Sequence, residues 1–294
     1  MKRTESKKQG FGKTILAAAV TVGAVTMAFQ GLAQAALAAE AGTRESVSTS
    51  YATAAASAPG QSPALPEGYV KQEYTLTDSD LEYYRGKKPA AQELSREEAA
   101  EIGVQGLYRV FGLEMGGKTI EMAYNPAQDG CRANWTGSWW VDGPKSSPEA
   151  YVQSYFFSVD ALSGELNLVQ HNRVLGQTVS AGFDGALAQD AGEYEALAKD
   201  LAGKLGAVQS GVKAVEYAGQ GITNNDPDIF FQVTGEGGER ARLQFSRYDK
   251  ALLCVVFERG VAEMEAQAQQ AEAFAQQAEA YFQQNPGAKT YEGR

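Results

Sequence analysis

The chain has few of the residues on which most enzyme active sites depend. Its 294 residues include one histidine, His171, and two cysteines, Cys131 and Cys254. Zinc hydrolases usually need paired histidine ligands such as HExxH, and the sequence has none. It also lacks a Gly-x-Ser-x-Gly elbow, a phosphate-binding loop that opens a helix, and a cysteine with a neighbouring histidine. We therefore predict a protein that is not an enzyme, with no catalytic residue, no metal site and no cofactor.

Cationic residues are scarce as well. The chain has 26 Lys and Arg against 36 Asp and Glu, for a net charge of −10. This acidity argues against nucleic acid and anionic membrane surfaces as partners. Cys131 and Cys254 lack the spacing of a metal site or a disulfide framework. Outside the cytoplasm they could pair, but two free, mostly buried thiols are the interpretation that we favour.

The first 41 residues have the layout of a secretory signal peptide or of a membrane anchor. A basic start is followed by an apolar, uncharged stretch over residues 14–29, and Ala33-Gln34-Ala35 and Ala36-Leu37-Ala38 both fit a signal-peptide cleavage site. The uncharged stretch continues to Ala39, which is also long enough for an uncleaved membrane anchor. Both alternatives predict a secreted or cell-surface, extracytoplasmic protein whose membrane contact is limited to this segment. Residues 42–68, rich in Ser, Thr, Ala and Pro, predict a disordered linker.

Residues 69–175 predict a helix followed by four strands. Ser95-Arg-Glu-Glu98 is a capping box, apolar residues then recur at helical spacing to Phe111, and Gly112 is a plausible stop. Asp160 and Gly164 are the turn-forming residues of a strand–turn–strand unit over residues 151–170. The predicted strands are residues 119–124, 132–141, 151–159 and 165–171.

Residues 176–260 predict a looser copy of the same arrangement. A helix over residues 190–205 precedes four strands, and Asp249 stands where Asp160 stood, with Lys250-Ala251 in place of the Ser-Gly turn. Asn224 to Asp228 reads as a turn, not as a calcium site. The predicted strands are residues 212–217, 229–234, 241–245 and 252–257.

Residues 261–294 predict an Ala/Gln-rich helix and a tail. Over residues 261–284 the apolar positions follow the three-four spacing of a coiled coil. Three interpretations stay open: an amphipathic helix on the protein's own sheet, self-association, or insertion into a groove of another protein. The positions are Val261, Met264, Ala268, Ala271, Ala275, Ala278 and Phe282.

Three tryptophans, Trp135, Trp139 and Trp140, gather on one predicted strand and form a candidate partner-binding surface. Trp139 and Trp140 are adjacent, so in a strand they point to opposite faces. One of them can anchor a partner while the other packs in the core. The alternative is that both are covered by the fold itself.

Two segments together resemble the PepSY domain family, which occurs in the propeptides of thermolysin-type proteases and in a spore germination protein. They are the Ser95-Arg-Glu-Glu-Ala-Ala helix start and the Tyr155-Phe-Phe-Ser-Val-Asp-Ala-Leu-Ser-Gly-Glu hairpin. The likeness covers residues 95–170 well and 190–257 loosely. It implies an α+β fold of two tandem modules, each a helix on an antiparallel sheet, followed by the C-terminal helix. It also implies an exported, non-catalytic domain that binds or restrains another protein, often a peptidase or a cell-wall lytic enzyme.

The sequence therefore predicts a binding or regulatory protein of a bacterial cell envelope. Its expected partner is a protein, such as an envelope peptidase or lytic enzyme restrained in trans. Two alternatives from other classes are an envelope hydrolase that uses clustered carboxylates and an assembly protein that acts through residues 261–284.

Overall fold

The computed structural model describes residues 47–48, 65–128, 131–141, 152–180 and 182–284. Its strands are β1 (Val47–Ser48), β2 (Thr75–Asp78), β3 (Thr119–Asn125), β4 (Asn134–Trp140), β5 (Ser154–Asp160), β6 (Leu166–Asn172), β7 (Val212–Thr223), β8 (Asp226–Gly235), β9 (Arg240–Ser246) and β10 (Leu252–Val256). Its helices are η1 (Glu82–Tyr84), α2 (Arg96–Phe111), α3 (Gly185–Gln189), α4 (Gly192–Lys204) and α5 (Glu258–Gln284). The predicted leader and most of the predicted linker lie outside the described residues.

Helix α2 confirms the best-defined sequence prediction. The Ser95 side chain accepts a hydrogen bond from the Glu98 N–H, and the Glu98 carboxylate accepts one from the Ser95 N–H at 2.9 Å. At the other end Gly112 takes a left-handed conformation with φ of 64°, and its N–H donates to the Tyr108 carbonyl. Both ends are therefore determined by local sequence, as a capping box and a C-terminal glycine allow.

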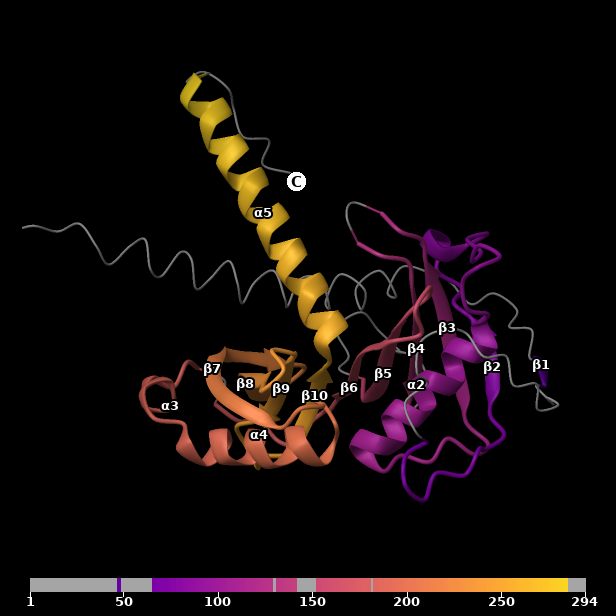
Figure 1. Cartoon of the computed structure of the whole chain (residues 1–294), viewed down its shortest axis with the longest axis horizontal. Coiled ribbons are helices and arrows are strands. Elements are labelled where there is room, and N and C mark those ends of the chain that lie inside the picture. Colours follow the sequence, from indigo (N-terminus) through magenta and orange to yellow (C-terminus); the bar gives the residue numbers. More distant parts are fainter. Residues whose placement is uncertain (1–46, 49–64, 129–130, 142–151, 181, 285–294) are drawn as a thin grey trace, which may run out of the picture.

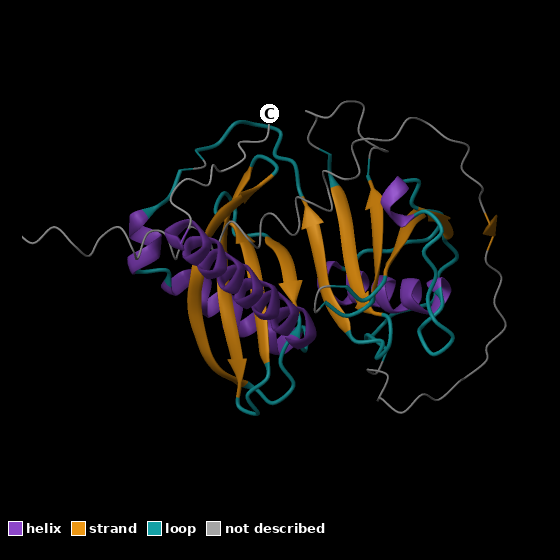
Figure 2. Ribbon diagram, turned by 90° about the horizontal axis from the view of Figure 1, so that it is seen from above, coloured by secondary structure: helices purple, strands orange, loops and turns teal. Residues whose placement is uncertain are grey.

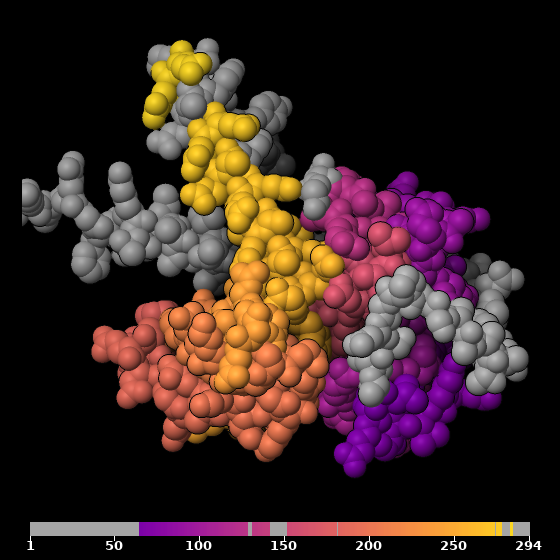
Figure 3. Space-filling view, in the orientation of Figure 1, coloured from indigo at the N-terminus to yellow at the C-terminus, as the bar shows by residue number. Residues whose placement is uncertain are grey.

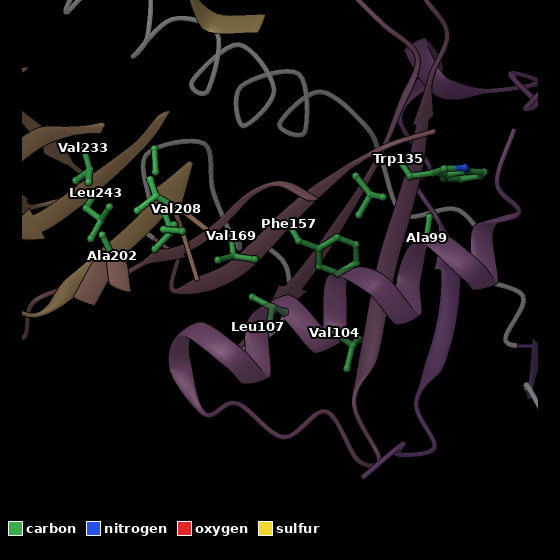
Figure 4. Packing of buried hydrophobic residues seen from close by; sticks show 14 of the residues in the cluster. Ala99, Val104, Leu107, Trp135, Phe157, Val169, Ala202, Val208, Val233 and Leu243 are labelled. Atoms are coloured by element: carbon green, nitrogen blue, oxygen red, sulfur yellow. The ribbon is translucent and has the colours of Figure 1, made fainter. Parts of the chain in front are cut away.

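Phe157 is the central side chain of the core beneath α2 (Figure 4). It lies between Gly103 of α2 and Gly137 of β4. A Cβ atom at either glycine would lie 2.1 Å from a Phe157 ring atom. The two glycines thus let the helix and the neighbouring strand close on the ring, which fixes the distance between α2 and the sheet.

Helix α4 covers the other end of the same face. Its buried residues Tyr194, Ala198 and Ala202 face Phe231 and other apolar side chains of β8 and β9. Gly206, which follows the helix, has a φ of 61°, the left-handed conformation in which a glycine commonly ends a helix. Figure 2 shows α2 and α4 behind one sheet, with α5 crossing on the opposite side.

The predicted fold class is wrong: the strands do not form two separate helix-plus-sheet modules. They form one large mixed sheet in the order β1-β2-β3-β4-β5-β6-β10-β9-β8-β7, in which β1 contributes two residues. Strands β6 and β10 pair directly, with Val169 opposite Val255 and Leu168 opposite Val256. The sheet is also not purely antiparallel, because β2 and β3 run parallel.

The apolar character of β6 and β10 explains this joining. Val169 and Val255 face the core beneath α2 and α4, while Leu168 and Val256 lie on the opposite face. Either strand left at an edge would expose apolar side chains and a row of unpaired backbone groups, and their pairing removes both. The strand order is consequently symmetric about the β6–β10 pair, with β5, β4 and β3 on one side and β9, β8 and β7 on the other.

Candidate functional site

The three tryptophans of β4 occupy different environments. Trp135 is buried, its Nε1 donates to the Leu94 carbonyl at 2.9 Å, and its ring packs against Tyr124. It therefore belongs to the core. Trp140 is half-buried on the face opposite α2 and is paired across the sheet with Ser154.

Trp139 begins a row of stacked rings across three strands. It lies parallel to Tyr155, with ring centroids 5.6 Å apart, and Tyr155 stacks on His171 at 4.1 Å. Phe111 packs edge-on against Tyr155 and His171, and the Lys118 ammonium lies 4.9 Å from the Trp139 ring. Burial and the charge of Arg173 lower the pKa of His171 to about 4, so its imidazole is neutral at pH 7. The ring faces pack against each other, and this arrangement favours a structural role.

Asp160 and Gly164 lie in the β5–β6 turn. The fully buried Asp160 carboxylate accepts the N–H groups of Leu162 and Ser163, and Arg132 Nε lies 2.7 Å from its Oδ2 atom. Burial alone would raise the pKa of Asp160, but these N–H groups and Arg132 together hold it below its ordinary value. Gly164 has a φ of 74° and donates its N–H to the Asp160 carbonyl.

The β9–β10 turn has the same backbone geometry in a different register from the predicted one. Ser246, and not Asp249, occupies the position of Asp160, because its N–H and carbonyl make the corresponding turn hydrogen bonds, to Ala251 and from Lys250. Lys250 takes the left-handed conformation in place of glycine, with a φ of 63°. Asp249 instead binds Arg173, which follows β6.

Arg173 is a residue that sequence reasoning missed. Its guanidinium pairs with Asp226 at 2.7 Å and binds Asp249 through two nitrogens, at 2.7 and 2.9 Å. Asn224 and Asn225, in the β7–β8 turn, bind backbone carbonyls of the same connecting segment. The local sequence carried no signal for this cluster, since its members come from three separate segments.

Among the described carboxyl groups whose pKa is raised, that of Asp228 is raised most. It is 1% exposed, and its Oδ2 accepts from Thr223 at 2.8 Å and from Gln244 at 2.7 Å. Its Oδ1 has no hydrogen-bond partner among the described residues. Burial raises the pKa of Asp228 to about 6. The predicted turn ends earlier than expected, because Asp226 to Asp228 belong to β8.

Helix α5 is attached to the sheet by its first eleven residues, 258–268, which we call the base of α5. Arg240 of β9 pairs with Glu258 and Glu265 of the helix. On the other side, Arg259 of the helix binds Glu165 of the β5–β6 turn at 2.9 Å. The base therefore joins β9, on one side of the β6–β10 pair, to the β5–β6 turn on the other, and Figure 1 shows its lower end beside β10.

The remainder of α5, residues 269–284, is called the arm. Residues 269–273 and 275–277 are all exposed, and Figure 3 shows the helix standing away from the body of the protein. The sequence Ala-Gln-Gln-Ala-Glu-Ala occurs at residues 268–273 and again, seven residues later, at 275–280. This seven-residue repeat is a stronger sequence signal for a coiled-coil helix than the spacing of single apolar residues. The helix also begins three residues before the predicted start.

Both cysteines of the chain are free thiols. Cys131 and Cys254 are not paired with each other, and Cys131 accepts a hydrogen bond from Gln267 in the base of α5. Within the described ranges, no group of three or more His, Cys, Asp or Glu side chains could hold a metal ion.

Comparison with other proteins adds no relative. Among the helices that the structure describes, none is long and apolar enough to span a bilayer. The chain matches no protein-family model, no curated protein and no solved structure. The likeness to PepSY domains therefore stays a prediction from sequence.

Proposed function

We propose that this protein is a non-catalytic binding protein of a bacterial cell envelope, which captures and restrains a partner enzyme through the arm of α5. The partner class, a peptidase or a cell-wall lytic enzyme, comes from the PepSY resemblance. The extracytoplasmic location comes from the leader in residues 1–41.

One observation carries the proposal: α5 is anchored at one end, and every arm residue whose side chain is described is exposed. Ion pairs to Arg240 and from Arg259 fix the base on both sides, so the direction of the helix is set by the body. The arm of 16 residues extends roughly 24 Å at 1.5 Å per residue. Its Ala, Gln and Glu residues have high helix propensity, so the arm is helical before it meets a partner. Pre-organisation of this kind lowers the entropic cost of binding.

A truncation tests this proposal. A chain that ends at Ala268 keeps the base and lacks the arm. Envelope extracts of the source bacterium are passed over immobilised full-length and truncated protein, and the captured peptidase and cell-wall lytic activities are measured. We expect the full-length protein to retain and inhibit one such enzyme, and the truncated protein to lose both effects without a change in thermal stability. Equal capture by the two chains would count against the arm.

Matched substitutions locate the contact on the arm. Ala271 belongs to the predicted apolar stripe, whereas its neighbour Gln270 lies off it, and both residues are exposed. Ala271→Asp and Gln270→Asp have the same cost in helix propensity, within a few tenths of a kcal/mol. Selective loss of capture with Ala271→Asp supports docking through the stripe, and equal effects argue against it.

Self-association through α5 is the second candidate, favoured by the seven-residue repeat of the arm. Light scattering on the full-length and truncated chains decides between them. A dimer that becomes a monomer on truncation supports assembly, whereas one monomer mass for both chains excludes it.

A further inference from the structure

The base of α5 packs on an apolar patch that is separate from the main core. Leu168, Cys254 and Val256 of the sheet form one buried cluster with Val261 of the helix, and Phe156 and Met264 pack against it. The main core lies on the opposite face of the sheet, beneath α2 and α4. Removal of α5 would therefore uncover the small cluster and leave the main core closed.

Close packing at one glycine holds the base in place. A Cβ atom at Gly260 would lie 2.4 Å from the Asn167 carbonyl oxygen and 2.7 Å from a methyl carbon of Val256. The Phe257 N–H also donates to the Asn167 carbonyl at 2.8 Å. The helix can lie this near to β6 because residue 260 has no side chain. A single Cβ atom at this position would push the helix away from β6.

Charges around the base oppose docking as well as favouring it. The Glu263 side chain is directed to the same region as the buried Asp160, and one of its oxygens is buried without a hydrogen-bond partner among the described residues. Arg259 lies 3.9 Å from Asp160 and donates its hydrogen bonds to Glu165, which is largely exposed. Asp160 is paired with Arg132, whereas Glu263 makes no ion pair among the described residues, so Glu263 is the buried carboxyl group that weakens the contact between the base and the sheet.

We propose that the base of α5 is a releasable cover, which lifts from the sheet as a unit while the sheet, α2 and α4 remain folded. Elements with few buried apolar contacts open at lower free energy than the core of the same protein. The base offers one fully buried apolar side chain, Val261, among its described residues. Release uncovers Leu168, Val256 and the Cys254 thiol. This behaviour does not depend on the identity of any partner.

Cys254 provides a direct reporter of release. It is 4% exposed, and its cover includes Val261 of the helix. Labelling of the full-length protein by a thiol reagent is followed in a Cys131→Ser background, at a series of denaturant concentrations below the unfolding transition. Each rate is divided by the rate for an unstructured peptide, which gives the fraction of time that the thiol is open.

A releasable cover predicts an opening free energy below that of global unfolding and a much weaker dependence on denaturant, because the slope scales with the surface exposed. If Cys254 becomes accessible with the free energy and the slope of global unfolding, the base does not open independently and the proposal is wrong.

Two glycine substitutions supply the matched comparison. Gly260→Ala introduces the clash with Asn167, whereas Gly203→Ala in α4 places its Cβ in open space with no atom within 4 Å. Both changes raise helix propensity. We expect Gly260→Ala to accelerate Cys254 labelling at least tenfold and Gly203→Ala to leave it unchanged or slower. Equal labelling of the two variants would overturn the role of the base as the cover of this thiol.

Discussion

Arg173 joins the connecting segment after β6 to two turns of the sheet. Its Nε atom donates to Asp226 at 2.8 Å, and its two terminal nitrogens bind Asp249. Asp226 is fully buried, and Ser246 Oγ donates a second hydrogen bond to it at 2.6 Å. The guanidinium is thus the cation that compensates a buried carboxylate, and its removal leaves that carboxylate with one neutral partner.

The expected loss on Arg173→Met follows from the burial of each partner. Breaking a buried ion pair by removing one member costs about 3–5 kcal/mol, because the other charge stays buried. The contact with Asp249 adds less than about 1 kcal/mol, since that side chain is 41% exposed and its charge is screened by water. The Arg173 side chain itself is 17% exposed, so water partly replaces it. We expect a decrease of about 3 kcal/mol in the free energy of unfolding.

Denaturant unfolding at pH 7, followed by the fluorescence of the β4 tryptophans, measures this loss. Arg173→Lys is the matched control: it keeps the charge but not the forked geometry, and we expect it to lose about 1–2 kcal/mol. Adding Asp226→Asn to Arg173→Met removes the stranded charge and should restore about half of the loss. A decrease below about 1 kcal/mol for Arg173→Met, or no recovery in the double variant, would refute the argument.

Three further predictions concern buried groups and close packing. Because burial raises the pKa of Asp228 to about 6, ionisation of this carboxyl group destabilises the fold as pH rises from 4 to 7. Asp228→Asn should therefore be about 2 kcal/mol more stable than the wild type at pH 7.5 and equal to it near pH 4. Denaturant unfolding at both pH values measures the difference. Gly103→Ala places a Cβ 2.1 Å from the Phe157 ring and should lower the free energy of unfolding by about 2–3 kcal/mol, whereas Gly203→Ala should be neutral or slightly stabilising in the same assay. Burial and the neighbouring Asp160 carboxylate raise the pKa of Glu263. Docking of the base on the sheet is therefore strongest below that pKa and weakens as pH rises through it. Hydrogen exchange of residues 261–267, corrected for the intrinsic rate, should show this loss of protection in the wild type and not in Glu263→Gln.

Sequence reasoning succeeded where structure is determined locally. The capping box at Ser95 and the glycine at 112 specify both ends of α2 within a few residues of chain. The adjacent Trp139 and Trp140 point to opposite faces, as strand geometry requires. Which of the two faces solvent could not be derived, because it depends on the helices and strands that cover each face.

The errors have non-local causes. Pairing of β6 with β10 joins residues more than eighty positions apart, and both strands read from sequence as ordinary buried strands. In the second turn the acidic Asp249 drew the comparison with Asp160, but turn geometry is decided by backbone hydrogen bonds, which Ser246 makes. Helix α5 begins before the predicted residue 261 and includes Gly260, a poor helix former that the close approach to β6 requires.

One arginine follows each strand of the β6–β10 pair, about which the sheet is symmetric. The ion pairs of these two arginines differ in strength. Arg173 follows β6 and binds the fully buried Asp226, at the start of β8, at hydrogen-bond distance, together with the partly exposed Asp249 in the turn after β9. Arg259 follows β10 and reaches the turn after β5, where it is 3.9 Å from the buried Asp160 and binds mainly the exposed Glu165. An ion pair that is exposed contributes less than one that compensates a buried charge. Increasing denaturant should therefore detach α5 before it separates the two sides of the sheet, and loss of the Arg173 contacts should reverse that order by weakening the sheet first.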